Sequence, residues 1–250
     1  MSDLDEDYDL IILQKYSWRS FKIKIKLFKK TPYFSIHKYF SGVEFNRLLH
    51  SFYSISTLLG KYGNLKSTEI KTYFNLKYSH NTFNEHSNQI VIAIGGIDPT
   101  RTYNKWDELI RKILKSHPTF KIVLVGNENG LEESKRINNA FNNGRIVNLV
   151  GKNSIFETFD VLKKSKIIVC ADGGLMHMAQ AVNLPAIALF SDDIHPLMRF
   201  SESYKATAIH AKKNVSDISS SLIADELVRA INTPLINLRL IFLNEEPVCV

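Results

Sequence analysis

The sequence has little cysteine and no long apolar run. Its two cysteines, Cys170 and Cys249, are too few for a disulfide framework, which favours a reducing compartment. No apolar stretch approaches the roughly 20 residues that a membrane-spanning helix requires. The opening residues, MSDLDEDYDL, are acidic and lack the apolar core of a signal peptide. We therefore expect a globular protein of the cytoplasm.

Two common nucleotide-binding signatures are also missing. The chain contains no G-x-G-x-x-G motif, which weighs against a dinucleotide-dependent oxidoreductase, and no G-x-x-x-x-G-K-[ST] phosphate loop. It also has no recognisable cluster of metal-ligating residues. We expect neither a cofactor nor a metal ion.

Acidic residues are absent from a long segment near the start of the chain. No carboxylate lies between Asp9 and Glu44, although lysine, arginine and aromatic residues are frequent there. Such a segment suits anionic lipid, a phosphorylated glycolipid or nucleic acid, or it is simply a solvated face. No nucleic-acid-binding module is recognisable, so we expect no nucleic-acid partner. The residues that we name the basic patch, as a candidate membrane or acceptor surface, are Arg19, Lys22, Lys24, Lys26, Lys29 and Lys30.

The most informative stretch is a strand–turn–helix–strand pattern from Lys166 to Phe190. Ile167–Cys170 is a short apolar run rich in β-branched residues, as in a strand buried on both faces. Leu175–Val182 favours helix, and Ala186–Phe190 is a second buried strand. A hairpin turn at Asp172-Gly173 is the alternative, but the helix-favouring residues that follow disfavour it. The pattern predicts a βαβ unit of a parallel sheet.

The turn of this unit has the chemistry of an anion site. Gly173 and Gly174 at the start of a helix leave backbone N–H groups uncovered, so that a diphosphate can approach them. Asp172, at the carboxyl end of the strand, is placed to accept hydrogen bonds from hydroxyl groups. His177 lies on the first helical turn. The alternative interpretation is an N-cap aspartate with a packed histidine.

The rest of the chain alternates between strand and helix signals. Strands are expected over Tyr8–Gln14, Gln89–Ile94, Lys121–Val125, Arg145–Leu149 and Ala206–His210. Helices are expected over Phe45–Leu59, Lys105–Ser116, Leu131–Asn139, Ser154–Lys164 and Asp217–Ile231, with Ser154 and Ser216 as N-caps. Ser20–Phe28 alternates polar and apolar residues, which leaves a half-buried strand and a basic surface helix both open. The alternation predicts a doubly wound α/β protein.

One set of residues resembles a known family. The match comprises Asp172-Gly173-Gly174, His177, Ala179, Ala181, Pro185 and Leu189-Phe190. It is similar to the D-[ST]-G-x-x-H…A-x-A…P…L-[FY]-G signature of glycosyltransferase family 9, the heptosyltransferases of lipopolysaccharide synthesis. The resemblance implies the GT-B fold, with an ADP-sugar donor bound by a Rossmann-like C-terminal domain and the lipid acceptor bound by the N-terminal domain.

The resemblance also implies roles for residues before the signature. Gly95 and Gly96 match a glycine-rich strand end, and Arg101 matches a cation that contacts the donor diphosphate. That alignment also permits Lys105 in place of Arg101, and a plain surface arginine is a further alternative. Glu128 matches a glutamate that binds the donor ribose, and Lys152-Asn153 match a loop beside the adenine.

The chain departs from the family pattern at two places. Ser191-Asp192-Asp193 stands where the family has Gly-Pro-[ST], and these carboxylates would repel a diphosphate unless they turn outward. The family's opening strand, with its catalytic carboxylate, precedes the part that matches Tyr8–Gln14. We therefore expect an N-terminally truncated chain and assign no catalytic base.

The expected organisation is a partial N-terminal α/β domain over residues 1–84 and a complete donor-binding domain over residues 85–250, joined by a linker at Tyr78–Ser87. The expected function is transfer of a heptose or related sugar from an ADP-sugar to lipid A/core oligosaccharide. The expected location is the inner face of the bacterial inner membrane, as a peripheral protein of the cytoplasm. The alternative is a catalytically impaired remnant that binds the nucleotide-sugar or an anionic membrane surface without turnover.

Overall fold

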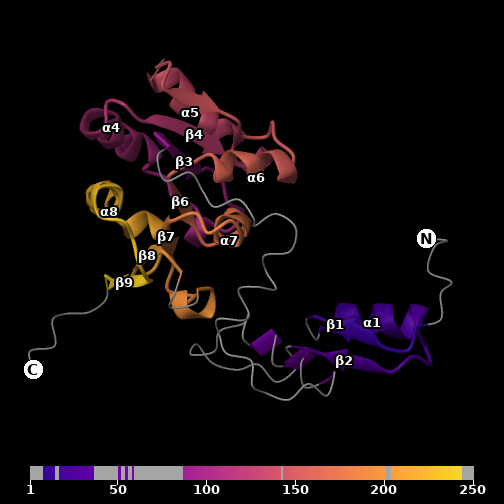
Figure 1. Cartoon of the computed structure of the whole chain (residues 1–250). Coiled ribbons are helices and arrows are strands. Elements are labelled where there is room, and N and C mark those ends of the chain that lie inside the picture. The colour runs from indigo at the N-terminus through magenta and orange to yellow at the C-terminus, as the bar shows by residue number, and fades with distance from the viewer. Residues whose placement is uncertain are drawn as a thin grey trace, which may run out of the picture. The chain divides into compact units, whose positions relative to one another are not determined.

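The computed structural model describes residues 8–14, 17–36, 50–51, 54–55, 58, 87–141, 143–200 and 204–243. The chain divides into two compact units, Met1–Lys71 and Thr72–Val250 (Figure 1). The domain boundary predicted between residues 84 and 85 lies outside the described residues, as does the predicted linker except for Ser87. That boundary stays a prediction.

The larger unit is built on a seven-stranded sheet in which all neighbouring strands are parallel, in the order β5-β4-β3-β6-β7-β8-β9. Its strands are β3 (Gln89–Ala93), β4 (Lys121–Val125), β5 (Ile146–Asn148), β6 (Ile167–Ala171), β7 (Ala186–Phe190), β8 (Ala206–His210) and β9 (Arg239–Phe242). A parallel sheet is covered on both faces, which explains why strands such as β7 are apolar throughout. The predicted α/β class with a parallel sheet is confirmed.

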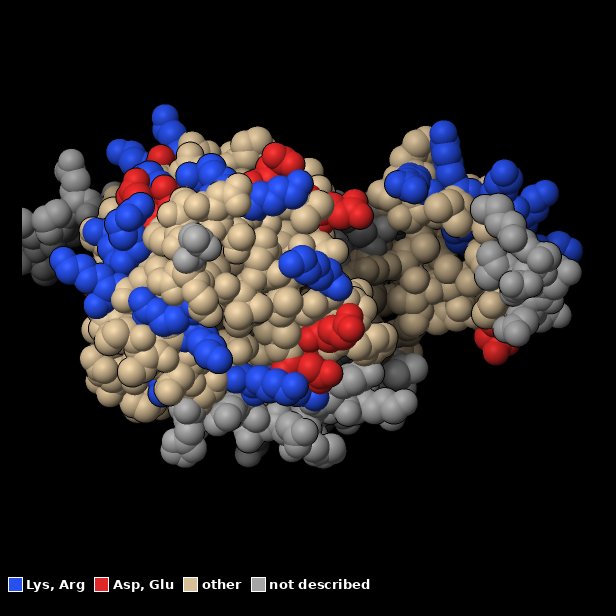
Figure 2. Space-filling model, turned by 90° about the horizontal axis from the view of Figure 1, so that it is seen from above, with Lys and Arg blue, Asp and Glu red and all other residues tan. Residues whose placement is uncertain are grey.

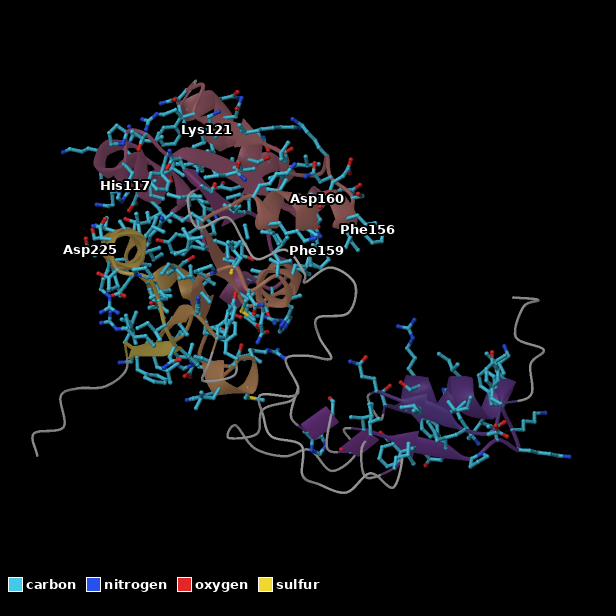
Figure 3. All side chains as sticks on the ribbon, viewed as in Figure 1. His117, Lys121, Phe156, Phe159, Asp160 and Asp225 are labelled. Carbon is cyan, nitrogen blue, oxygen red and sulfur yellow. The ribbon has the colours of Figure 1, made fainter. Side chains whose placement is uncertain are left out.

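Helices cover both faces of this sheet. One face carries α4 (Trp106–Ser116), α5 (Leu131–Phe141) and α8 (Ser220–Asn232), and the other carries α6 (Ile155–Lys163) and α7 (Gly174–Ala181). Alternate residues of one strand serve the two cores: Ile90 and Ile92 of β3 pack in the first, Val91 and Ala93 in the second. Asp225 on α8 and Phe159 on α6 accordingly lie on opposite sides of the sheet (Figure 3).

Local signals set most of the element boundaries in this unit. Ser154 and Glu157 form the predicted capping box at the start of α6. After α7, Asn183 adopts a left-handed conformation with φ of 55°, as predicted for a helix stop.

The predicted start of the last helix was wrong. Residues Val215–Asp217 form the short 3-10 helix η4, and α8 begins only at Ser220, with Ser219 as its N-cap. Ser216 is occupied elsewhere, because its hydroxyl donates to the carbonyl of Thr102 over 3.1 Å and accepts from the amide of Asn104 over 3.2 Å. Strand β9 was not predicted at all.

The described part of the smaller unit contains the strand β1 (Ile11–Leu13), the helix α1 (Trp18–Leu27) and the strand β2 (Tyr33–Ser35). The two strands pair in parallel, so the three elements form a βαβ unit. The alternating segment is therefore helical, and Ser17 caps it by accepting from the amide of Ser20 over 3.1 Å. Among the described residues, no helix is both long and apolar enough to cross a bilayer.

Replacing Trp106 with alanine is expected to lower the free energy of unfolding by about 3–5 kcal/mol. Its indole is 2% exposed and packs edge-on against Tyr103, with ring centroids 4.8 Å apart. Urea unfolding followed by circular dichroism measures the change. The matched control is Trp18→Ala, because Trp18 is 69% exposed and its loss should cost less than about 0.5 kcal/mol. Equal unfolding midpoints for the two variants would contradict the assigned core.

Candidate functional site

The residues predicted to bind the donor come from loops and a helix start at one edge of the larger unit's sheet. In a parallel sheet, the carboxyl ends of neighbouring strands meet at the same edge, where ligands of doubly wound folds bind. In the order of the strands across the sheet, the residues that follow them are Lys152 and Asn153 after β5, Glu128 after β4, Gly95 and Gly96 after β3, and Asp172, Gly173 and Gly174 after β6. With about 4.8 Å between strands, these residues form a row that suits an extended ligand.

The glycines after β3 are explained by contacts between loops. Gly95 has φ of +106°, and a β-carbon there would lie 3.0 Å from the amide nitrogen of Gly130 in the loop after β4. A β-carbon on Gly96 would overlap the hydroxyl of Thr102. These two glycines let the loops approach one another closely.

Gly174 has a different environment. It is the first residue of α7, and a β-carbon there would meet no atom within 4 Å. Gly173, the N-cap residue, offers no side chain to the first helical turn. The start of α7 therefore has no side-chain cap and an exposed first residue, as an anion site requires.

Asp172 is buried and held between two guanidinium groups. Its Oδ2 accepts from Nη1 of Arg101 and from Nη2 of Arg199, each over 3.3 Å, and its Oδ1 lies 3.1 Å from Nε of Arg199. The side chain of Asp172 is only 2% exposed. We expected this carboxylate to accept from ligand hydroxyls, whereas in the structure its partners are two arginines.

Arg199 was missed in the sequence analysis. It follows the short 3-10 helix η3 (Pro196–Met198) in the loop after β7, 27 residues from Asp172. The family signature includes no residue here, and a single arginine in a loop carries no periodic signal. The buried aspartate was the available clue, because such a carboxylate requires a cation.

Arg101 contacts Asp172 at the carboxyl end of β6, and its role as a cation for the donor diphosphate stays a prediction. It ends the short 3-10 helix η1 (Pro99–Arg101) and is also bound to Asp98, with its Nη2 3.1 Å and its Nε 3.2 Å from Oδ2. Hydrogen bonds from Thr100 lower the pKa of Asp98, and its contacts with Arg101 add to this effect. Lys105, the alternative to Arg101, is the N-cap residue of α4.

The other predicted residues lie at the surface of the same edge. Glu128 is exposed at the start of the 3-10 helix η2 (Glu128–Gly130). The ammonium group of Lys152 donates to the carbonyl of Asn148 over 2.8 Å. His177 is exposed on the first turns of α7. Partial desolvation of its ring lowers its pKa, and the positive charge of Arg199 lowers it further, whereas the negative charge of Asp172 raises it.

The carboxylates that depart from the family pattern lie at the surface. Asp192 and Asp193 are both exposed, and Oδ2 of Asp193 accepts from the hydroxyl of Thr100 over 3.5 Å. Within the described residues, no group of three or more histidine, cysteine, aspartate or glutamate side chains is placed to hold a metal ion.

An open cavity of about 520 Å³ lies beside this site rather than in it. It is lined by residues of the loops after β3 and β8, among them Ile97, Pro99, Asn104, Asn214 and Ser216. Neither Asp172 nor Gly174 contributes to its wall. The candidate site is therefore the exposed sheet edge around Asp172 and Gly174.

Comparison with known proteins identifies the family. The model of glycosyltransferase family 9 (heptosyltransferase) matches residues 5–217. Lipooligosaccharide heptosyltransferase 2 of Haemophilus influenzae is 48% identical over 44 residues, which span 18% of this chain and 13% of that protein.

Solved structures show the same fold. The E. coli ADP-heptose lps heptosyltransferase II aligns with a TM-score of 0.63 at 19% identity, covering 90% of this chain and 77% of its own. E. coli heptosyltransferase WaaC with ADP aligns with a TM-score of 0.65 at 16% identity, covering 90% and 73%. The family 9 glycosyl transferase of Veillonella parvula gives 0.64 at 13% identity, covering 91% and 75%. The predicted GT-B-like architecture is confirmed, and the chain belongs to glycosyltransferase family 9.

Proposed function

We propose that this protein transfers a heptose or related sugar from an ADP-sugar to the inner core of lipopolysaccharide or lipooligosaccharide. The observation that carries the proposal is the family match, which includes the strand end and helix start around Asp172 and Gly174. A structural relative is described with ADP and another form of it with ADP-2-deoxy-2-fluoro heptose, which supports a nucleotide-sugar donor.

The donor is proposed to lie along the carboxyl edge of the larger unit. Its diphosphate would accept hydrogen bonds from the free N–H groups of Gly174 and its helical neighbours, beside the guanidinium group of Arg101. Glu128 would accept from the ribose hydroxyls, while Lys152 and Asn153 would lie near the adenine. These contacts need only the larger unit.

The chemistry follows from the same groups. The acceptor hydroxyl loses its proton to a carboxylate and attacks the anomeric carbon as the bond to the diphosphate breaks. Negative charge then grows on the leaving diphosphate, where Arg101 and the N–H groups of α7 stabilise it. We assign no described residue as the base.

The acceptor is proposed to reach the protein from an anionic membrane surface, on the cytoplasmic face of the inner membrane. Five residues of the basic patch are exposed: Arg19, Lys22, Lys26, Lys29 and Lys30. Figure 2 shows lysine and arginine side chains gathered on the smaller unit, with few carboxylates among them. Trp18, Ile23 and Ile25 of α1 are exposed beside these charges, and such a mixture suits a lipid interface.

Lys24 is a correction to the basic patch. It is buried, with Nζ 3.4 Å from the carbonyl of Lys29 and 5.5 Å from the centre of the Tyr33 ring. In the helix, Lys24 faces the paired strands β1 and β2. In a strand, its side chain would have pointed to the same face as those of Lys22 and Lys26. We leave it out of the proposed surface.

The purified protein is expected to transfer radiolabelled heptose from ADP-heptose to a core-truncated lipopolysaccharide acceptor. Binding of ADP is measured in parallel by calorimetry. Binding with turnover supports the transferase, and binding without turnover supports the alternative of an impaired enzyme. A folded protein that binds neither ADP nor ADP-heptose would contradict the proposed donor site.

Replacing Gly174 with valine should abolish or strongly weaken ADP binding without unfolding the protein. The side chain would enter space that is open in the free protein, so the cost falls on the ligand. The matched control is Gly144→Val, because a β-carbon at Gly144 also meets no atom within 4 Å, but that residue precedes β5 at the opposite edge of the sheet. Calorimetry with ADP that gave equal affinities for both variants would remove Gly174 from the donor site.

Replacing Lys22, Lys26 and Lys29 with glutamine should weaken binding to vesicles that contain anionic lipid. Each basic residue near such a surface contributes about 1 kcal/mol, so the triple variant should bind about 100-fold more weakly at low salt. Liposome sedimentation measures the difference. The control has the same net charge and carries glutamine at the exposed Lys112, Lys115 and Lys121 of the larger unit. Equal binding by the two variants, or equal binding to neutral vesicles, would contradict the proposal.

A further inference from the structure

We propose that Arg199 binds the diphosphate of the donor, and that Asp172 serves chiefly to position Arg199 and Arg101 for it. The inference rests on the proposed function, since it takes the ligand to be a nucleotide diphosphate. It changes the roles that the sequence predicted, because Arg101 was the expected phosphate cation and Asp172 the expected partner of sugar hydroxyls.

The Asp172 carboxylate is largely occupied by the two arginines. Three nitrogen atoms of Arg101 and Arg199 lie within 3.3 Å of its two oxygens. The two hydrogen bonds are both accepted by Oδ2, and the contact of Nε with Oδ1 is an ion pair in which Nε has no hydrogen-bond partner. The side chain is also 2% exposed, which leaves little of it within reach of a ligand. Its main contacts are therefore with the two guanidinium groups.

The two arginines differ in how many of their guanidinium nitrogens are engaged. All three guanidinium nitrogens of Arg101 are engaged, with Nε and Nη2 on Asp98 and Nη1 on Asp172. In Arg199, Nε and Nη2 face Asp172. No described residue accepts a hydrogen bond from its Nη1, and the side chain as a whole is 16% exposed. Within the part of the chain that the structure describes, Arg199 is thus the arginine of the pair with an unengaged terminal nitrogen.

The charges of the cluster differ in how far water screens them. Arg101 and Asp98 form an outer pair with side chains 35% and 38% exposed, so water screens both of their charges. The cation that is most shielded from water is therefore Arg199, whose side chain is 16% exposed. An anion beside its guanidinium group would gain charge-assisted hydrogen bonds.

The position of the cluster agrees with a diphosphate. Asp172 stands two residues before Gly174, the first residue of α7, so both arginines are held near the uncapped helix start. Arg101 comes from the loop after β3 and Arg199 from the loop after β7, on either side of β6 in the sheet. A phosphate group at the helix start would have cations on both sides.

The test compares Arg199→Gln with the wild-type protein by calorimetry, using ADP, inorganic pyrophosphate and adenosine as separate probes. Hydrogen bonds to a charged group contribute about 1.5–3 kcal/mol, so ADP and pyrophosphate should bind about 10–150-fold more weakly. Adenosine should bind with unchanged affinity. Arg199→Lys should recover part of the pyrophosphate affinity, since it restores the charge. The matched control is Arg229→Gln on α8, where the side chain is 49% exposed and lies 3.7 Å from Glu226.

The outcomes separate this inference from the proposed function. If Arg199→Gln binds ADP as tightly as the wild-type protein does, the proposed role of Arg199 is overturned and the transferase proposal still stands. Loss of pyrophosphate affinity in a protein without transferase activity would support Arg199 and overturn the function. Equal weakening of adenosine and ADP would show a merely structural role and overturn the inference. Should Arg199→Gln not fold, the pyrophosphate affinity of Arg199→Lys decides. An affinity equal to that of the wild-type protein would overturn the need for a guanidinium group at this position, and a partial loss would support it.

Discussion

The arrangement of the site depends on the buried carboxylate of Asp172. A buried charge without partners is costly, and a single hydrogen bond does not offset that cost. Asp172 is therefore stable at its position only while Arg101 and Arg199 remain there, and each arginine brings a loop with it. One carboxylate thus joins the end of β6 to the loops after β3 and β7. The same loops are linked again by the contact between Thr100 and Asp193.

The parallel sheet explains why residues so distant in sequence share one edge. Each strand ends at the same side, so successive loops lie next to one another and make specific contacts. The amide of Gly151 donates to the carbonyl of Gly126 over 2.9 Å, and Gly95 lies against Gly130. The strands supply rigid positions, and the loops between them supply the polar groups. A ligand along this edge would meet a surface formed before it binds.

The sequence predicted the elements whose signals are local. Apolar runs such as that of β7 and the capping pair Ser154 and Glu157 carry their own physical reasons. Strand β9 was not predicted although residues 240–243 form a continuous apolar run; the strand is short and its four residues are only partly buried. The start of α8 was wrong because Ser216 bonds to Thr102 and Asn104, which no local rule reveals. Arg199 was missed for the same reason: its partner is brought to it by the fold.

Helix α1 has a consequence for how the protein folds. Its sequence alternates polar and apolar residues, as a half-buried strand does, yet its described conformation is helical. From Phe21 to Leu27, the alternating pattern is thus that of a strand, whereas the conformation is that of a helix. Before its neighbours are in place, this segment can pair with the edge of another chain as a strand. The lysines that alternate with its isoleucines would place like charges opposite one another in a second copy paired in register, which disfavours that pairing.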